Sequence, residues 1–147
     1  MRLVIAAPAN GAILKDALKA HLQNDTRVSS LVDLSSPEGT YPQLSFAAAE
    51  EVVAGRADRA LLICGTGVGT AIAANKVRGI RAATAHDLLT LRGSMENYDA
   101  QVLCMGQNVI AAPAAWALVD IWLDLRHDTS SGYAPKVSEI EAFEREK

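Results

Sequence analysis

Short runs of apolar residues alternate along the whole chain with segments whose apolar residues recur every three or four positions. Each run has the length of a strand, and polar or glycine-containing turns bound it. Runs that are apolar at consecutive positions are typical of strands buried on both faces of a parallel sheet. The expected strands are residues 3–7, 27–34, 60–64, 80–85 and 101–105.

The segments between these runs predict helices. Leu14, Leu18 and Leu22 repeat at helical spacing, and residues 88–97 fit either a helix or a loop because Gly93 weakens a helix. Leu44, Ala48 and Val52 mark a second helix, and residues 70–77 form a third. A fourth spans residues 112–125, with Ala112, Ala115, Trp116, Val119 and Leu123 on one side. A short C-terminal helix starts with the capping box Ser138–Glu141. This alternation predicts an α/β fold in which helices cover both faces of a five-stranded parallel sheet.

Ligands bind such a sheet at the carboxyl ends of its strands. The most informative of these ends is the one at Cys64, where an apolar run is followed by the glycine-rich turn Gly65-Thr66-Gly67-Val68-Gly69. Glycines let main-chain N–H groups approach a phosphate, a carboxylate or an enediolate oxygen, and such groups also favour a thiolate. His86 and Asn108 are expected at the same edge, because each follows another predicted strand.

Plainer interpretations exist for each of these residues. Cys64 also fits a small buried side chain, the glycines a tight turn, and the Thr66 hydroxyl a helix cap rather than a substrate contact. The G-x-G-x-G spacing keeps a nucleotide site open, with Asp87 as the ribose partner, whereas the absence of a following Gly-Lys-Ser/Thr excludes a P-loop. No His, Cys and carboxylate set has metal-ligand spacing.

Composition narrows the function classes. The 147 residues fit one domain, and the formal net charge of −3 argues against nucleic acid or an anionic membrane as the main partner. No apolar run approaches the roughly 18 residues that span a bilayer. Two cysteines in strand-like runs favour a reduced, cytoplasmic protein.

The segment Ile63-Cys64-Gly65-Thr66-Gly67-Val68-Gly69, followed by Ile72-Ala73-Ala74-Asn75-Lys76-Val77, resembles the type B ribose-5-phosphate isomerase and galactose-6-phosphate isomerase family. Tyr41-Pro42, Asp99-Ala100-Gln101 and Lys136-Val137 fit the same pattern, and the resemblance extends over nearly the whole chain. Thr84-Ala85-His86-Asp87 and Cys104-Met105-Gly106-Gln107 bring the chain nearest the branch that acts on D-erythrulose 4-phosphate.

This resemblance implies a three-layer, Rossmann-like fold and aldose–ketose isomerisation of a small tetrose or pentose phosphate without a metal or other cofactor. It implies that Cys64 is the base, that Thr66 moves a hydroxyl proton, and that the turn amides hold an enediolate. It also implies a homodimer, or a dimer of dimers, whose sites are shared between subunits. The residues then expected to bind substrate are Gly65, Gly67, Val68, Gly69, Tyr41, His86, Tyr98, Asn108 and Lys136.

The chain departs from the family pattern at several site positions. Pro8-Ala9 stands where the family has an Asp-His or Asp-Asn pair, and Asn97-Tyr98 where ribose enzymes have His-Asn. Asn108 and Gly132 replace arginines, and Lys136 replaces another. These departures keep two alternatives open, an isomerase of an unphosphorylated or modified sugar and a family member that binds a metabolite without catalysis.

Overall fold

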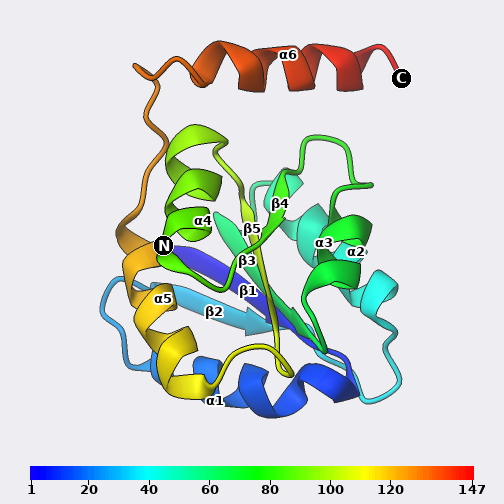
Figure 1. Cartoon of the computed structure of the whole chain (residues 1–147). Coiled ribbons are helices and arrows are strands. Elements are labelled where there is room, and N and C mark those ends of the chain that lie inside the picture. Colours follow the sequence, from blue (N-terminus) through cyan, green and yellow to red (C-terminus); the bar gives the residue numbers. More distant parts are fainter.

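A five-stranded parallel sheet forms the centre of the computed structural model, which describes residues 1–147 (Figure 1). The strand order is β2-β1-β3-β5-β4, so β3 lies in the middle and β2 and β4 are the two edges. All neighbouring pairs are parallel, as the consecutive apolar runs predicted. The strands are β1 (Arg2–Ala6), β2 (Ser30–Asp33), β3 (Arg59–Cys64), β4 (Ala82–Thr84) and β5 (Val102–Gly106).

Helices cover both faces of this sheet, which confirms the predicted three-layer fold. Side chains alternate between the faces of a strand, so Ile63 of β3 packs toward α1 (Ala12–Gln23) and α5 (Ala112–Asp124). Leu62 packs toward α2 (Tyr41–Val53) and α3 (Val68–Ala74) on the opposite face. The sheet therefore separates two hydrophobic clusters.

The segment that the sequence left as helix or loop is helical. The carboxylate of Asp87 accepts a hydrogen bond from the Thr90 N–H at 2.8 Å at the start of α4 (Leu88–Arg92). This helix continues directly into the π-helical turn η2 (Gly93–Asn97). Leu91 and Met95 of this segment are buried in the cluster under α5. Asp87 therefore caps a helix in this chain.

The C-terminal helix starts earlier than predicted. It is α6 (Ala134–Arg145), with a proline in its first turn, and Ser138 lies inside it with its hydroxyl directed at the Ala134 carbonyl. The helix stands away from the rest of the chain (Figure 1). Glu141 pairs with Arg81 at 3.1 Å, and Glu144 accepts a hydrogen bond from the Gly79 N–H at 2.9 Å.

Three smaller expectations also need correction. The second strand is shorter than residues 27–34 because Asp25 holds the Arg27 N–H in a turn at 2.9 Å. The fourth strand covers only Ala82–Thr84 of the predicted residues 80–85. Trp116, predicted on one side of α5 with Ala115 and Val119, is 37% exposed and stacks on His21 of α1, whereas Trp122 is fully buried.

Candidate active site

The Cys64 sulfur lies at the carboxyl end of the central strand and is surrounded by hydrogen-bonding groups. The Gly67 N–H donates to Sγ at 3.1 Å, and the Thr70 hydroxyl lies 3.7 Å from it. The side chain is 6% exposed, so water screens these contacts little. The sulfur therefore lies within reach of main-chain donors at the carboxyl edge of the sheet.

Burial raises the pKa of the Cys64 thiol, since a thiolate loses solvation inside the protein. Hydrogen bonds from the Thr70 side chain and from the N–H groups of Thr70, Thr66 and Gly67 act in the opposite direction. They outweigh burial, and the pKa lies below its ordinary value. The second thiol, Cys104, is fully buried and its pKa is raised to about 12, so only Cys64 is suited to act as a base.

Two glycines allow the turn after Cys64 to sit directly on β5. Gly67 has φ +78°, and a Cβ there would lie 2.9 Å from the Met105 main chain. A Cβ on Gly106 would lie 2.5 Å from the Thr66 main chain. Neither contact is compatible with a side chain, so this close approach requires glycine.

Two asparagine side chains flank the turn at Gly65. Asn108 follows β5, and its N–H donates to the Gly65 carbonyl at 2.9 Å. Asn10 belongs to the 3₁₀ turn η1 (Ala9–Gly11), which lies close to the end of β3 because Gly11 has no side chain. A Cβ on Gly65 would meet the two amide groups at 3.2 Å and 3.3 Å.

Sequence reasoning predicted Asn108 at this site and missed Asn10. The available signal was its position directly after the first strand, at the same edge of the sheet. Both side chains are exposed and uncharged, and they place amide donors and acceptors beside the glycine turn.

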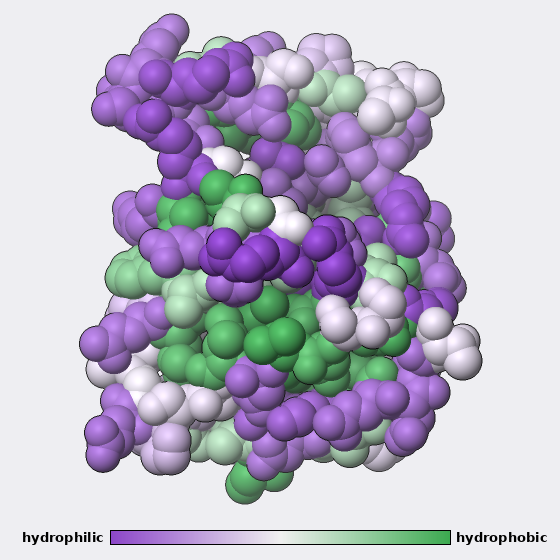
Figure 2. Space-filling view, turned by 180° about the vertical axis from the view of Figure 1, so that it is seen from behind, coloured by the Kyte–Doolittle hydropathy of each residue, from purple (hydrophilic) through white to green (hydrophobic).

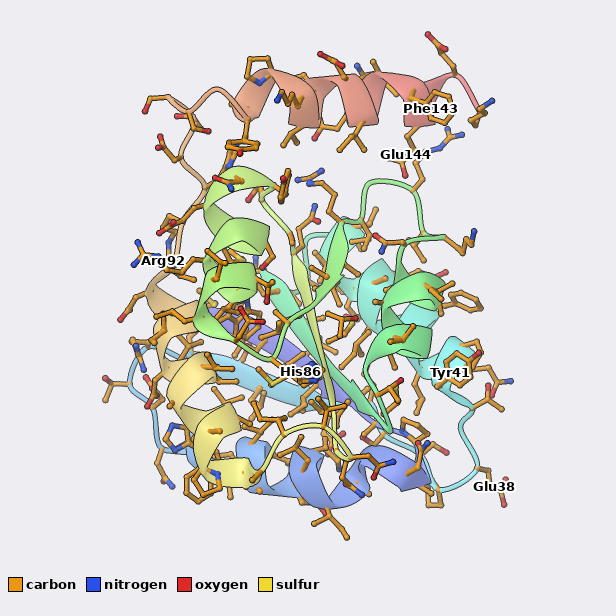
Figure 3. The ribbon with its side chains drawn as sticks, viewed as in Figure 1. Glu38, Tyr41, His86, Arg92, Phe143 and Glu144 are labelled. Atoms are coloured by element: carbon orange, nitrogen blue, oxygen red, sulfur yellow. The ribbon has the colours of Figure 1, made fainter.

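Tyr41, His86 and Thr66 complete the group that lies around this turn. The Tyr41 ring packs over Gly69, where a Cβ would lie 2.9 Å from Cε2. Thr66 is exposed, and its hydroxyl accepts a hydrogen bond from the N–H of Val68, which is itself exposed. In Figure 3, Tyr41 and His86 both lie far from α6, which carries Phe143 and Glu144.

His86 is held in one protonation state by its neighbours. The Gly106 N–H donates to Nε2 at 2.8 Å, so the ring proton is on Nδ1. Burial lowers the pKa of His86, and the nearby Asp87 opposes this effect only in part. The imidazole is therefore neutral near pH 7 and accepts a hydrogen bond from the last residue of β5.

Tyr98 and Lys136, also predicted as site residues, lie elsewhere in the chain. The Tyr98 carbonyl accepts a hydrogen bond at 2.7 Å from Arg81, which immediately precedes β4 and so lies at the amino edge of the sheet. The Tyr98 ring contacts Tyr133 edge-on, and the Lys136 ammonium lies 5.2 Å from the Tyr133 ring centre. These residues do not meet Cys64 within one chain.

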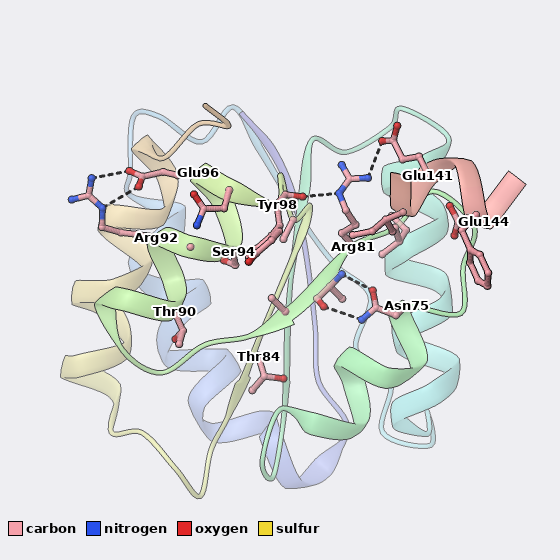
Figure 4. A pocket seen from close by; sticks show the side chains of 18 of the residues that line it. Asn75, Arg81, Thr84, Thr90, Arg92, Ser94, Glu96, Tyr98, Glu141 and Glu144 are labelled. Atoms are coloured by element: carbon pink, nitrogen blue, oxygen red, sulfur yellow. Dashed lines mark hydrogen bonds and ion pairs between the residues drawn. The ribbon is translucent and has the colours of Figure 1, made fainter. Parts of the chain in front are cut away.

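A groove of about 1200 Å³ lies between α6 and the edge strand β4 (Figure 4). Tyr98, Arg81 and Glu141 line its α6 end, and Thr84 lies at its other end. Asn75 pairs with both main-chain groups of Ala82 at 2.8 Å, which satisfies part of the open strand edge. Cys64 does not line this groove, but the Thr84 hydroxyl connects the two regions by donating to the Gly67 carbonyl at 2.8 Å.

Two further properties concern possible ligands and surroundings. No three His, Cys, Asp or Glu side chains lie together in a way that would bind a metal ion. None of the helices combines the length and the apolar character that crossing a membrane requires. The site chemistry that this chain itself supplies is that of one thiol, main-chain N–H groups, hydroxyls and amides.

The family model described as Ribose/Galactose Isomerase matches residues 3–140. The chain is 48% identical to D-erythrulose-4-phosphate isomerase 2 of Mycolicibacterium smegmatis, over 98% of this chain and 97% of that protein. It is 35% identical to ribose-5-phosphate isomerase B of Escherichia coli, over 93% and 92%. The structure of Clostridium thermocellum ribose-5-phosphate isomerase B matches with a TM-score of 0.93 at 33% identity, covering 99% of both chains.

Proposed function

Since the chain belongs to the ribose/galactose isomerase family, we propose that it interconverts the aldose and ketose forms of a small sugar phosphate, a tetrose or a pentose phosphate. The observation that carries this proposal is the Gly67 N–H donating to the Cys64 sulfur at 3.1 Å. It places a thiol of lowered pKa beside main-chain donors, which suits removal of a proton next to a carbonyl.

In this mechanism the Cys64 thiolate removes the proton from the hydroxyl-bearing carbon next to the carbonyl. The electron pair of that bond forms a carbon–carbon double bond while the π pair of the carbonyl moves to its oxygen, giving an enediolate that the N–H groups of the turn between Gly65 and Gly69 stabilise. The Cys64 thiol then returns the proton to the former carbonyl carbon. The exposed Thr66 hydroxyl carries the remaining proton between the two oxygens.

The chain's own residues favour a four-carbon substrate among sugar phosphates. Pro8 and Ala9 have no side-chain group that could donate or accept a proton at the site, so they cannot assist the opening of a sugar ring. A tetrose 4-phosphate needs no such step, because the oxygen that would close a five-membered ring carries the phosphate. Asn10 and Asn108 then remain to bind hydroxyl or phosphate oxygens.

We further propose that a second copy of the chain completes each site. Tyr98, Tyr133 and Lys136 form one cluster at the base of α6, and Lys136 would supply a positive charge for the phosphate. α6 leaves Ile140 51% and Phe143 62% exposed beside the groove, which is apolar surface suited to an interface. Apolar residues also gather in the middle of the face that is seen when the molecule is turned by 180° from Figure 1 (Figure 2), which offers a surface for a dimer of dimers.

A reduced thiol is essential to this chemistry, so we place the enzyme in the cytoplasm, where thiols stay reduced. Both cysteines are free and buried.

One observation supports a second candidate, an isomerase of an unphosphorylated or modified sugar. Asn108 and Gly132 occupy positions where the family resemblance implies arginines that bind phosphate, which leaves that role to substitutes such as Arg92, Arg126 or Lys136. Turnover of four-, five- and six-carbon ketoses, each with and without a terminal phosphate, separates the candidates. We expect the tetrulose phosphate to give the highest kcat/KM; a higher value for a sugar without phosphate would replace the first candidate by the second.

A further inference from the structure

Thr70 is buried at 1% exposure in the first turn of α3, and its hydroxyl lies between the Gly67 carbonyl and the Cys64 sulfur, with the Cys104 thiol as a third neighbour. Oγ1 lies 3.2 Å from the Gly67 carbonyl oxygen and 3.7 Å from the Cys64 sulfur. A hydroxyl has one proton to donate and can also accept. When Thr70 donates to the carbonyl it can accept from the Cys64 S–H, and when it donates to the sulfur the carbonyl loses that bond.

The Gly67 carbonyl has a second donor, which lowers the free-energy cost of this exchange. The Thr84 hydroxyl, on the edge strand β4, donates to the same oxygen at 2.8 Å, the shorter of the two distances. Losing the only hydrogen bond of a buried carbonyl would cost about 1–3 kcal/mol. With Thr84 in place, the carbonyl keeps one donor in both arrangements.

We propose that Thr70 is a positioning residue whose hydroxyl follows the charge on Cys64, accepting from the neutral thiol and donating to the thiolate, while Thr84 holds the Gly67 carbonyl. Its importance for turnover rests on the proposed function, because only a catalytic Cys64 alternates between these two forms in each cycle. The exchange itself is a property of the folded chain and can be measured without substrate.

Other titratable groups nearby do not supply the same donor. The Cys104 thiol on β5 also contacts the Thr70 hydroxyl, but its pKa of about 12 keeps it neutral. His86 is occupied by the Gly106 N–H, and the Tyr41 ring lies over Gly69 at the outer side of the turn. Among side chains, Thr70 alone provides a hydrogen bond to the Cys64 sulfur.

The test is the pH dependence of Cys64 alkylation by iodoacetamide, with the modified residue located by mass spectrometry. Thr70→Val removes the hydroxyl and keeps the shape, so we expect alkylation at neutral pH to slow about tenfold and its midpoint to move to higher pH. Thr70→Ser keeps the hydroxyl and should restore the wild-type profile. An unchanged profile in Thr70→Val would overturn the proposal.

Thr84→Val tests the second half of the proposal and serves if Thr70→Val does not fold. Without Thr84, the Thr70 hydroxyl must stay on the Gly67 carbonyl, so the midpoint should again rise. The alkylation midpoint of the double variant should be no higher than that of Thr70→Val alone, because both changes remove the same donor to the sulfur. Additive effects, or a Thr84→Val profile like the wild type, would contradict the exchange. Neither result depends on isomerase activity, so the proposed function can fail while this inference holds, and the reverse.

Discussion

The main-chain N–H of Gly67 lies 3.1 Å from the sulfur of Cys64, and the two residues are held together by the turn between them. Gly67 adopts φ +78° against the backbone of Met105, a conformation and an approach that together require glycine. The position of the N–H donor therefore depends on β5 as well as on the turn itself.

Gly67→Ala should destabilise the protein and reduce its activity. The new methyl group combines left-handed strain with a contact at 2.9 Å to the Met105 main chain, so we expect a loss of about 2–4 kcal/mol in the free energy of unfolding. Gly55→Ala is the matched control, since Gly55 has φ +72° but no atom within 4 Å of its added Cβ. It should cost only about 1 kcal/mol and leave kcat unchanged. Equal losses in urea unfolding would show that packing on β5 contributes nothing.

The pH dependence of kcat/KM should have an acidic limb set by Cys64. The thiolate is the active form, so activity falls as pH falls through the thiol pKa, which the hydrogen bonds at Sγ hold below its ordinary value. His86 stays neutral over the same range and adds no second limb, because its pKa is lowered. A steady-state profile with its acidic limb above the ordinary thiol range would contradict this account of the hydrogen bonds at Sγ.

Asn10 and Asn108 should each contribute to substrate binding. Replacing either by Ala removes an amide at the edge of the Gly65 turn, and we expect kcat/KM to fall about tenfold with little change in stability. Asn24→Ala is the control, because its side chain is also exposed but bonds only to the Ala20 carbonyl at the end of α1. If Asn10→Ala behaves like Asn24→Ala, the 3₁₀ turn after β1 is not part of the site.

Subunit mixing tests whether Tyr98 and Lys136 act in the site of a second copy. Cys64→Ala and Lys136→Ala should each be weakly active alone. Refolded together from an equal mixture, they should regain about a quarter of wild-type activity, because half of the dimers are mixed and one of their two sites is intact. Mixing Tyr98→Phe subunits with Cys64→Ala subunits provides a second pair that tests whether the Tyr98 hydroxyl binds substrate. No recovery of activity in the mixture would contradict a site shared between two copies of the chain.

The sequence predicted those parts of the site whose positions follow from the order of strands, turns and helices along the chain. An apolar run followed by three glycines placed Cys64 at a strand end in a turn, and the alternation of elements placed His86 and Asn108 at the same edge. Asn10 was missed because its approach to Gly65 is a long-range contact that depends on how Gly11 packs against β3.

Local pattern also explains the errors. Ser138 and Glu141 satisfy the spacing of a capping box, but the helix already begins at Ala134, where Pro135 suits a first turn. The separation of Tyr98 and Lys136 from Cys64 within one chain could not be read from periodicity, because it follows from where η2 ends and α6 begins relative to the sheet, and their role in the site stays a prediction.

The most direct test of the central claim is hydrogen exchange at the carbons next to the carbonyl of D-erythrulose 4-phosphate in deuterated water, followed by NMR. The wild-type chain should introduce deuterium as it isomerises the sugar, and Cys64→Ala should lose this exchange while still binding the ligand. Undiminished exchange in Cys64→Ala would remove Cys64 from the role of base. Binding without exchange by the wild-type chain would make it a metabolite-binding protein rather than an isomerase.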